Sequence, residues 1–491
     1  MTPHSDSIRA DNKAGNASLG EMDFTGLTSD SRKVAPGYLF AALSGSKTDG
    51  ARFIADAVAR GAVAVLGVPA LADAVASSGV RFIADDNPRA RLAHMAAEFY
   101  GAQPETVAAV TGTKGKSSIV AFLREIWTML GHPAASLGTV GVMGPKGAMP
   151  LQHTTPDPVE IHALLAKLAD EGVDHLAIEA SSHGLDQHRL DGVRIAAVGF
   201  TNITRDHMDY HPTFDDYLKA KLRLFAQVAK DGAVAVVNAD AAHAEAFIAA
   251  ARARGLTLMT VGETGGDIRL AARESLGDSQ KLTIVHAGHT YIVTLPLAGD
   301  FQAANALVAA GLAIGLGAAP AKVFAALEGL KGAPGRMEKV AFAVSGAPVY
   351  VDYAHTPDSL EKVLQALRPH TAARLHVVFG CGGDRDRGKR PLMGAIAARL
   401  ADDVIVTDDN PRSEDPAAIR SEILAAAPGA REIGDRAQAI RAAMGALAKG
   451  DVLVIAGKGH ETGQYIKGVT HPFSDREQAI AAATELGGRS A

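Results

Sequence analysis

The stretch TVAAVTGTKGKSSIVAFLREIW, residues 106–127, is the most informative part of this chain about its fold class. An apolar run leads to Gly112, a short loop rich in glycine and lysine follows, and apolar residues then recur at helical spacing. Glycines let backbone amides turn toward phosphate oxygens, and a helix N-terminus favours an anion. The pattern therefore predicts a buried strand, a phosphate-binding loop and a helix.

The residue types of the loop indicate nucleotide chemistry. Lys116 can reach the β- and γ-phosphates, and the Ser117 hydroxyl can bind Mg²⁺. The standard spacing GxxxxGK[ST] would need glycine at Val110, so this loop is a shortened variant, GTxGKS. An ordinary glycine-rich turn with an exposed lysine is the alternative, which the flanking strand and helix disfavour. We expect ATP contacts from Gly112, Thr113, Lys114, Gly115, Lys116, Ser117 and Ser118.

Short β-branched runs alternate with Ala- and Leu-rich stretches along nearly the whole chain. We expect strands at 62–68, 106–112, 175–180, 196–202, 233–239, 375–380, 403–409 and 451–457. Apolar strands joined by helices predict the α/β class with parallel sheets. The 491 residues exceed one hydrophobic core and suggest about three domains. Boundaries at the AQPE turn (102–105) and at the Gly- and Pro-rich segment 329–338 give domains at 1–104, 105–334 and 335–491.

Composition excludes several classes of protein. A net charge of -5 gives no support to nucleic-acid binding, which needs a basic surface. One cysteine, Cys381, cannot form an internal disulfide and fits a reducing compartment. No run reaches the ~18 apolar residues of a membrane helix. The polar N-terminal 20 residues lack the apolar segment of a secretory signal, so we expect a cytoplasmic protein.

Acidic and imidazole side chains follow two neighbouring predicted strands. Glu179 ends one apolar run, and Asp206, His207 and Asp209 follow the next. Oxygen ligands beside a phosphate loop favour Mg²⁺. Zinc bound by His183, His188, His207 and His211 is the alternative, disfavoured because no cysteine accompanies them. The helical segment 217–225 carries Lys219, Lys221 and Arg223 and by itself predicts a solvated basic face.

Six motifs occur in one order along the chain: GTKGKS, EASSHGLDQHR, TNITRDHMDYH, LAGDFQAAN, DYAHTPDS and GCGGDRDRGKRP. In these motifs, and over about 30–480, the chain resembles the Mur ligases, ATP-dependent amide-forming enzymes of peptidoglycan precursor synthesis. SSHGLDQHR and GCGGDRDRGKRP resemble in particular the members that add a diamino acid to UDP-N-acetylmuramoyl-L-alanyl-D-glutamate. The resemblance implies an N-terminal UDP-binding α/β domain, a central P-loop ATPase-like domain and a C-terminal Rossmann-like domain. It also implies a role in cell wall synthesis, cell shape and cell division, and we expect a monomer.

The resemblance implies catalytic and metal-binding roles at matching positions. Lys116, Lys221 and His207 would be catalytic, and the metal ligands would be Ser117, Glu179, His207 and Lys221. Lys221 matches the family's carbamylated lysine, whose CO₂ adduct turns an ammonium into a carboxylate-like ligand for a second Mg²⁺. Asn305, Arg336, Asp352 and His355 fall where the family contacts ATP. The UDP-sugar peptide would contact Ser31, Thr154, Thr155, Ser181, Gln187 and Arg189.

The incoming amino acid would bind in the C-terminal domain, at residues that follow predicted strands. We expect contacts from Arg385, Asp409, Asn410, Arg412, Gly457 and Glu461. Arginine pairs with carboxylates in a bidentate manner, so Arg412 suits meso-2,6-diaminopimelate and disfavours lysine, which lacks the distal carboxylate. The family's diaminopimelate-adding members carry DNPR here. The earlier DDNPR copy at 85–89 has no phosphate loop or charge cluster beside it, so we interpret Asp86 and Arg89 as structural.

Several positions depart from the family pattern: Lys114 stands where Asn is common, Ser117 where Thr is common, His153 where Asn is frequent, and Gln302 replaces an Asn. Three alternatives stay open. The first is a lysine-adding Mur ligase, which only the argument from Arg412 disfavours. A folylpolyglutamate-type ligase shares the GTxGK loop and the acyl-phosphate chemistry. A nucleotide-gated binding protein would bind ATP without synthesis.

Overall fold

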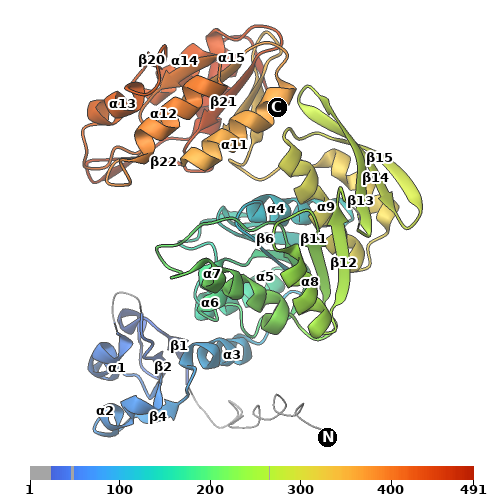
Figure 1. The fold of residues 1–491 in the computed structure, drawn as a ribbon. Coiled ribbons are helices and arrows are strands. Elements are labelled where there is room, and N and C mark those ends of the chain that lie inside the picture. The colour runs from blue at the N-terminus through green and yellow to red at the C-terminus, as the bar shows by residue number, and fades with distance from the viewer. Residues whose placement is uncertain (1–23, 46–48, 265) are drawn as a thin grey trace, which may run out of the picture. The chain divides into compact units, whose positions relative to one another are not determined.

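The computed structural model describes residues 24–45, 49–264 and 266–491. The polar N-terminal segment discussed above lies outside these residues. The chain forms two compact units, which we describe separately. The first unit holds residues up to 103 together with 156–170 and 187–193, and the second holds 104–155, 171–186 and 194–491. Strands and helices alternate along both (Figure 1), which confirms the α/β class.

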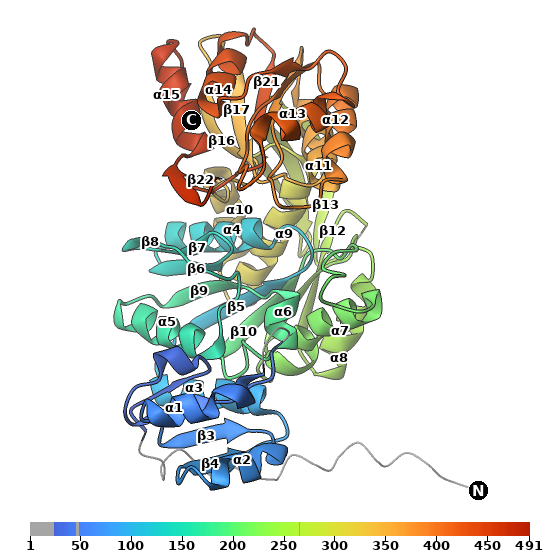
Figure 2. The same cartoon turned by 90° about the vertical axis from the view of Figure 1, so that its left-hand side faces the viewer.

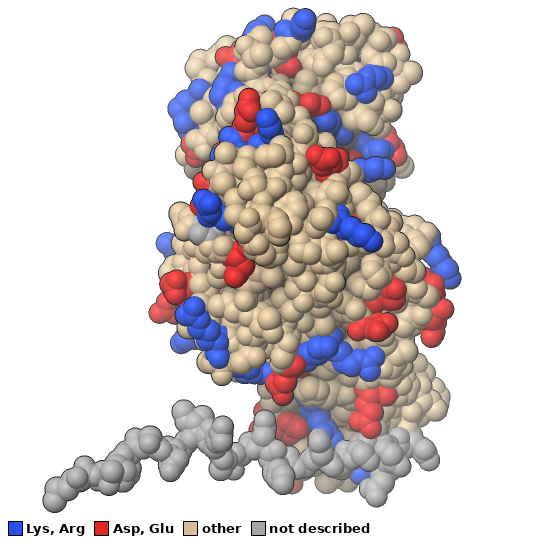
Figure 3. Space-filling view, turned by 90° about the vertical axis from the view of Figure 1, so that its right-hand side faces the viewer, with Lys and Arg blue, Asp and Glu red and all other residues tan. Residues whose placement is uncertain are grey.

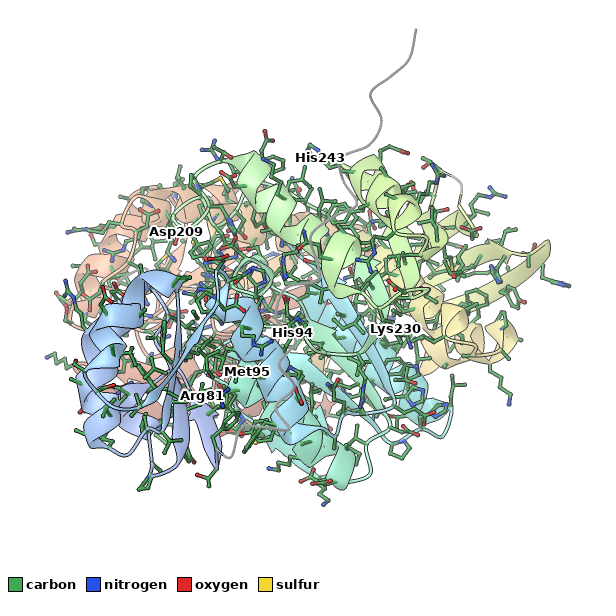
Figure 4. All side chains as sticks on the ribbon, turned by 90° about the horizontal axis from the view of Figure 1, so that it is seen from below. Arg81, His94, Met95, Asp209, Lys230 and His243 are labelled. Carbon is green, nitrogen blue, oxygen red and sulfur yellow. The ribbon has the colours of Figure 1, made fainter. Side chains whose placement is uncertain are left out.

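The first unit is built on a four-stranded parallel sheet in the order β1-β2-β3-β4. Its strands are β1 Gly26–Thr28, β2 Tyr38–Ala41, β3 Ala64–Gly67 and β4 Arg81–Ala84. Its helices are α1 Ile54–Ala59, α2 Ala72–Ala76, α3 Pro88–Tyr100 and α5 Pro158–Asp170. Helix α3 packs on α5, and its Met95 is buried while the adjacent His94 is exposed; both are labelled in Figure 4.

The larger sheet of the second unit has eleven strands, and its centre carries the phosphate loop. Its order is β15-β14-β13-β12-β11-β10-β5-β9-β6-β7-β8. The strands β12, β11, β10, β5, β9 and β6 pair in parallel, as the sequence predicted. Antiparallel strands extend both edges, which the sequence analysis did not predict. The bounds are β5 Thr106–Thr111, β6 Ala134–Gly138, β7 Gly141–Gly144, β8 Gly147–Met149, β9 His175–Glu179, β10 Ile195–Phe200, β11 Val234–Asn238, β12 Thr257–Gly262, β13 Ile268–Leu276, β14 Ser279–His286 and β15 His289–Leu295.

Helices cover this sheet and complete its core. Helix α4 follows the phosphate loop and packs against α9, and residues of both helices share one apolar cluster with the sheet. On α8, Phe247 stacks against Phe200 of β10 at a ring distance of 3.7 Å. The helices are α4 Lys116–Met129, α6 Ser182–Asp186, α7 Phe214–Arg223, α8 Ala244–Ala253, α9 Asp300–Gly315 and α10 Pro320–Ala326.

The C-terminal part of the second unit is a doubly wound sheet. Its order is β20-β19-β18-β21-β17-β16-β24, with β20 to β17 parallel. Helices α11, α12 and α13 share one apolar cluster with the sheet and α14 and α15 share another, so helices cover both faces (Figure 2). The strands are β16 Glu338–Phe342, β17 Pro348–Asp352, β18 Leu375–Phe379, β19 Asp403–Val406, β20 Arg431–Glu432, β21 Val452–Ala456 and β24 Arg489–Ser490; a separate hairpin pairs β22 Gly463–Ile466 with β23 Val469–Pro472. The helices are α11 Pro357–Leu367, α12 Lys389–Leu400, α13 Pro416–Leu424, α14 Arg436–Gly445 and α15 Asp475–Glu485.

Each strand expected from the sequence is present within a few residues of its expected bounds. Within the described residues, no helix is both long and apolar enough to cross a bilayer. On the face that Figure 3 shows, lysine and arginine are interspersed with aspartate and glutamate. The division into three domains stays a prediction.

Candidate active site

The phosphate loop joins β5 to α4 and is held open by two glycines in left-handed or near-left-handed backbone. Gly112 has φ 150° and Gly115 has φ 87°. A Cβ on Gly112 would lie 2.9 Å from the Asn202 carbonyl oxygen, and one on Gly115 would lie 3.0 Å from the Thr201 hydroxyl oxygen. Larger residues at either position would therefore displace the β10 end from the loop. The Asn202 side chain accepts a hydrogen bond from the Lys114 amide at 3.1 Å and fixes the loop further.

Two lysines converge on one carbonyl of this loop. The ammonium of Lys116 donates to the Gly112 carbonyl oxygen at 2.9 Å, and that of Lys221 donates to the same oxygen at 2.7 Å. Lys221 is 1% exposed and lies 4.6 Å from the Tyr217 ring centre. Burial lowers the pKa of both lysines, that of Lys221 well below its usual value, with the charge of Lys116 adding to the effect. The local prediction of a solvated basic face is therefore wrong for Lys221, although Lys219 on the same helix is exposed.

Glu179, the last residue of β9, lies on the other side of the loop. Its carboxylate accepts from the Thr139 amide at 2.8 Å and from the Thr139 hydroxyl at 3.2 Å. The hydroxyls of Thr139 and Thr154 are 3.0 Å apart, and Thr155 donates to the Glu179 carbonyl oxygen. Glu179 and Ser117 line the same small pocket. A carboxylate and hydroxyls beside a phosphate loop form an oxygen-rich environment of the kind that Mg²⁺ prefers.

His207 and His211, which follow β10, form an aromatic group with His183 of α6. The ring centre of His183 lies 5.0 Å from that of His207 and 5.7 Å from that of His211. His207 has φ 54° and an exposed side chain, whereas His211 is buried and its Nε2 has no hydrogen-bond partner among the described residues. Burial lowers the pKa of His211. Asp206 and Asp209 are exposed, the latter labelled in Figure 4.

Within the described residues, no three of the four histidines considered for zinc bring their ring nitrogens within 4.8 Å of one another. His188 belongs to the first unit, where its Nδ1 lies 2.9 Å from an Asp191 carboxylate oxygen. Among residues 24–45, 49–264 and 266–491, the one group of three or more His, Cys, Asp or Glu ligand atoms within 4.8 Å of one another consists of His132, Asp174 and His175. His175 begins β9 and Glu179 ends it, so this group lies at the opposite end of that strand from the phosphate loop.

The four further residues expected at ATP lie on α9 and on the segments around β17. Asn305 donates to the buried Gln302 side chain at 3.1 Å, and Gln302 in turn donates to the Arg336 carbonyl oxygen at 3.4 Å. The Arg336 guanidinium lies 4.6 Å from the Tyr353 ring centre, and in the part of the chain that the structure describes its buried Nε has no hydrogen-bond partner. A nucleotide could therefore use the stacking face and the donor of this arginine.

Asp352 ends β17, His355 follows it, and the backbone around them positions both side chains. Asp352 accepts from the Met337 amide at 2.7 Å. Burial raises its pKa, an effect that the charge of Arg336 partly offsets. The Nδ1 of His355 lies 2.8 Å from the Tyr353 carbonyl oxygen, and burial lowers the pKa of His355. Neutral His355 would therefore present one free ring nitrogen near pH 7.

The second DDNPR copy forms a loop at the carboxyl end of β19. Asp409 and Asn410 are buried, and Arg412 has the strained value φ 54°. The Arg412 guanidinium donates to the Gly383 carbonyl oxygen at 2.7 Å, and Asn410 donates to Glu461 at 2.9 Å. A Cβ on Gly457 would lie 2.6 Å from an Asp409 carboxylate oxygen, so glycine permits this close approach.

Five of the six residues predicted for the amino acid are thus held together around the ends of β19 and β21: Asp409, Asn410, Arg412, Gly457 and Glu461. The sixth, Arg385, is exposed on the neighbouring 381–388 loop, whose Asp384 accepts from Ser413. The pKa of Cys381 is raised to about 12 by burial, which agrees with a packing role for this thiol.

The residues expected at the UDP-sugar peptide divide between the two units. In the first unit, Ser31 is buried at the start of a short 3₁₀-helix, and Arg189 donates to the Gln187 side chain at 2.8 Å. In the second unit, the Thr155 hydroxyl accepts from the Ser181 amide at 3.1 Å, and the Ser181 hydroxyl accepts from the Gly184 amide at 3.0 Å.

Two residues of the first DDNPR copy make contacts within the first unit, and the structural role of Asp86 and Arg89 stays a prediction. Asn87 caps α3 by accepting from the Ala90 amide, and Arg89 donates to the Ser44 carbonyl oxygen. Both contacts lie within the first unit.

Comparisons with known proteins give matches that together span most of this chain. Three family profiles match: the Mur ligase family catalytic domain over residues 23–100, the Mur ligase middle domain over 110–313 and the Mur ligase glutamate ligase domain over 335–459. The UDP-N-acetylmuramoyl-L-alanyl-D-glutamate–2,6-diaminopimelate ligase of Bradyrhizobium diazoefficiens is 59% identical over 469 residues, 95% of this chain and 96% of that protein. The chain belongs to the Mur ligase family.

Two solved structures resemble this Mur ligase over much of its length. A structure of a UDP-N-acetylmuramoyl-L-alanyl-D-glutamate–2,6-diaminopimelate ligase superposes with a TM-score of 0.71 at 35% identity, covering 94% of this chain and 95% of that one. A Mycobacterium tuberculosis folylpolyglutamate synthase complexed with ADP superposes with a TM-score of 0.61 at 19% identity, covering 75% of this chain and 91% of that one. The second likeness is one of fold alone.

Three residues of this Mur ligase contribute to the site although the sequence analysis did not single them out. Asn202 holds the phosphate loop, Tyr217 packs against Lys221, and Lys458 is buried beside Asn410 and Glu461. Asn202 lies within the quoted motif TNITRDHMDYH, Tyr217 begins the helical segment 217–225, and Lys458 follows the predicted site residue Gly457. Polar residues inside those motifs were the available signal.

Proposed function

We propose that this chain is the ATP-dependent ligase that joins meso-2,6-diaminopimelate to the D-glutamyl γ-carboxylate of UDP-N-acetylmuramoyl-L-alanyl-D-glutamate. The observation that carries the proposal is the 59% identity, over nearly the whole of both chains, to an enzyme of that name. The phosphate loop and the DDNPR loop support it, since each supplies the residue types that one of the two substrates requires.

The proposed reaction has two steps that balance in atoms and charge. The γ-carboxylate attacks the γ-phosphorus of ATP, which gives an acyl phosphate and ADP. The amine of diaminopimelate then attacks the acyl carbon and expels inorganic phosphate, with loss of a proton from nitrogen. Both steps gather negative charge on crowded oxygens, so positioning and fixed positive charge are the main contributions of the protein. We assign this charge to Lys116, and the backbone amides of Gly112 to Ser118 would hold the phosphates.

Lys221 suits the carbamate that we propose for it. A free ammonium at this buried position faces the charge of Lys116 across a single carbonyl oxygen. The lowered pKa of Lys221 favours the neutral amine, which is the form that adds CO₂. The adduct would be an anion beside Lys116, so repulsion would become attraction.

The donor set around the loop fits magnesium. Ser117 and Glu179 line one pocket and offer oxygen atoms, and a carbamate on Lys221 would add more. We propose Ser117, Glu179, His207 and Lys221 as the ligands of two ions. Bound magnesium would neutralise phosphate oxygens during transfer.

The remaining assignments follow the division of the chain. We propose contacts with adenine, ribose or phosphates from Asn305, Arg336, Asp352 and His355, and with the UDP-sugar peptide from Ser31, Thr154, Thr155, Ser181, Gln187 and Arg189. Three domains with the boundaries given above, and a monomeric state, complete the proposal.

In our proposal, amino-acid choice rests on the charged residues around the ends of β19 and β21. In our proposal Arg412 and Arg385 pair with carboxylates, and Asp409 and Glu461 accept from ammonium groups. Lysine would leave an arginine without its carboxylate partner, which disfavours it.

The test is phosphate release from ATP with UDP-N-acetylmuramoyl-L-alanyl-D-glutamate and a panel of amino acids. We expect release that depends on both the UDP-dipeptide and meso-diaminopimelate. A higher kcat/KM with lysine than with diaminopimelate would show that the chain uses the substrate of the lysine-adding members. Release that needs no UDP-dipeptide but accepts a folate would favour the folylpolyglutamate-type alternative, and nucleotide binding without release would favour a binding protein.

A further inference from the structure

Lys458 is a fully buried lysine in the loop that follows β21. Its side chain is 0% exposed, and its ammonium donates to the Asn410 Oδ1 at 3.0 Å and to the Glu461 Oε2 at 3.0 Å. Both partners are residues that we assign to the amino-acid substrate. A buried ammonium is stable only with such partners, so these two bonds fix where Lys458 lies.

The hydrogen bonds of the Glu461 side chain all involve one of its two carboxylate oxygens, Oε2, within the described residues. Oε2 accepts from Lys458 and, at 2.9 Å, from the Asn410 Nδ2. No hydrogen bond within the described residues reaches Oε1, and the side chain is 33% exposed. A carboxylate fixed through one oxygen presents the other in a defined direction, which is the arrangement that an ammonium ligand needs.

The same network reaches the β22–β23 hairpin. The Asn410 Oδ1 also accepts from the Tyr465 amide at 2.9 Å, and the Arg412 amide donates to the Tyr465 carbonyl oxygen at 2.9 Å. The Gln464 side chain donates to the Asp409 carbonyl oxygen at 2.8 Å. Lys458 therefore lies where the DDNPR loop, its own loop and the hairpin meet.

We infer that Lys458 is a positioning residue for the amino-acid substrate. It holds Glu461 and Asn410 so that the free carboxylate oxygen of Glu461 accepts a hydrogen bond from an ammonium group of the substrate. This inference rests on the proposed function. A purely structural ion pair would stabilise the loop without changing the affinity for the amino acid.

The experiment compares Lys458→Met with Lys449→Met, an exposed lysine of the same domain. We expect Lys458→Met to raise the KM for diaminopimelate at least tenfold while the KM values for ATP and for the UDP-dipeptide change less than twofold. Lys449→Met should leave all three unchanged. Equal changes in all three KM values, or no change in that for diaminopimelate, would overturn the inference.

A double-variant cycle tests whether Lys458 acts through Glu461. Glu461→Gln alone should raise the KM for diaminopimelate, and adding Lys458→Met to it should change that KM less than twofold further. Multiplying effects would show independent roles and would overturn the inference. Lys458→Gln keeps a hydrogen-bond donor and replaces Lys458→Met if the methionine variant misfolds. It should give a KM for diaminopimelate between those of the unmodified protein and Lys458→Met. A KM equal to that of the unmodified protein would count against the role of charge.

Amino-acid use by the unmodified protein distinguishes a failure of this inference from a failure of the proposed function. If it uses lysine in place of diaminopimelate, the proposed substrate fails and the KM for lysine becomes the readout for Lys458. If it uses no amino acid, both proposals fail.

Discussion

Replacing Lys221 by methionine should abolish synthesis and raise thermal stability, two effects of opposite sign. Methionine keeps the unbranched shape but removes the amine, and with it the carbamate that we propose. The Gly112 carbonyl oxygen keeps its bond to Lys116, so no buried acceptor is orphaned. We expect kcat to fall at least ~100-fold, the scale of losing one preorganised charged group from an active site.

The stability gain follows from burial of the ammonium. One hydrogen bond from a charged donor, worth roughly 1.5–3 kcal/mol, is lost. Removing a buried ammonium that faces Lys116 recovers a desolvation penalty of several kcal/mol. We therefore expect a net gain of about 1–3 kcal/mol, and at roughly 2–4 °C per kcal/mol the melting midpoint should rise by about 2–12 °C.

The pH dependence has a defined sign. Because the pKa of Lys221 is lower in the folded chain than in the unfolded one, unmodified Lys221 destabilises the fold at neutral pH. This penalty declines as pH rises above the folded pKa and is gone above the unfolded value near ~10.4. The advantage of Lys221→Met should therefore shrink toward that pH.

The assay is differential scanning fluorimetry together with phosphate release, in CO₂-depleted buffer and with added bicarbonate. Bicarbonate should raise the activity of the unmodified protein and have no effect on the variant. Lys219→Met, an exposed lysine two residues earlier on α7, is the matched control and should change neither quantity. Retention of kcat within threefold, or a lower melting midpoint for Lys221→Met alone, would refute the reasoning.

Three further perturbations have defined outcomes. Arg412→Lys should lower kcat/KM for diaminopimelate at least ~30-fold, because lysine cannot pair with a carboxylate in a bidentate manner; steady-state kinetics check this, with the exposed Arg441→Lys as control. Lys114→Asn should keep kcat within about threefold and lower stability by less than ~1 kcal/mol, since its ammonium pairs with the exposed Asp358; urea unfolding and kinetics check this, and a tenfold loss of activity would contradict it. Cys381 should resist a thiol reagent at pH 8 in the native protein and react after denaturation, because its pKa is raised to about 12; prompt native-state labelling would contradict this.

The strands and the phosphate loop could be predicted because their signal is local. Residues 106–116 carry an apolar run, two glycines and two lysines, and the structure has β5, the loop and α4 in that order. The antiparallel edge strands β13, β14 and β15 were not predicted. Their polar and apolar residues are mixed, and the pairing that stabilises them depends on neighbours that a local pattern does not identify.

Burial at the site could not be predicted from local pattern. Lys221 lies on an amphipathic helix with charged neighbours, and the carbonyl it contacts belongs to a residue 109 positions earlier. Lys458 was passed over for the same reason, since its partner Asn410 is 48 positions away. The family resemblance, and not the spacing, identified Lys221.

The path of the chain through the first unit limits when that unit can form during synthesis. Helix α5 packs on α3, and Val159 of α5 contacts the apolar cluster that holds Leu92 and Met95. Residues 156–170 and 187–193 belong to the first unit although strand β5 precedes them. During synthesis on the ribosome, the apolar face of α3 therefore stays incompletely covered until residue 193 has been translated. A fragment ending at residue 103 should keep that face exposed and aggregate, whereas one extending past 193 contains every segment of the unit.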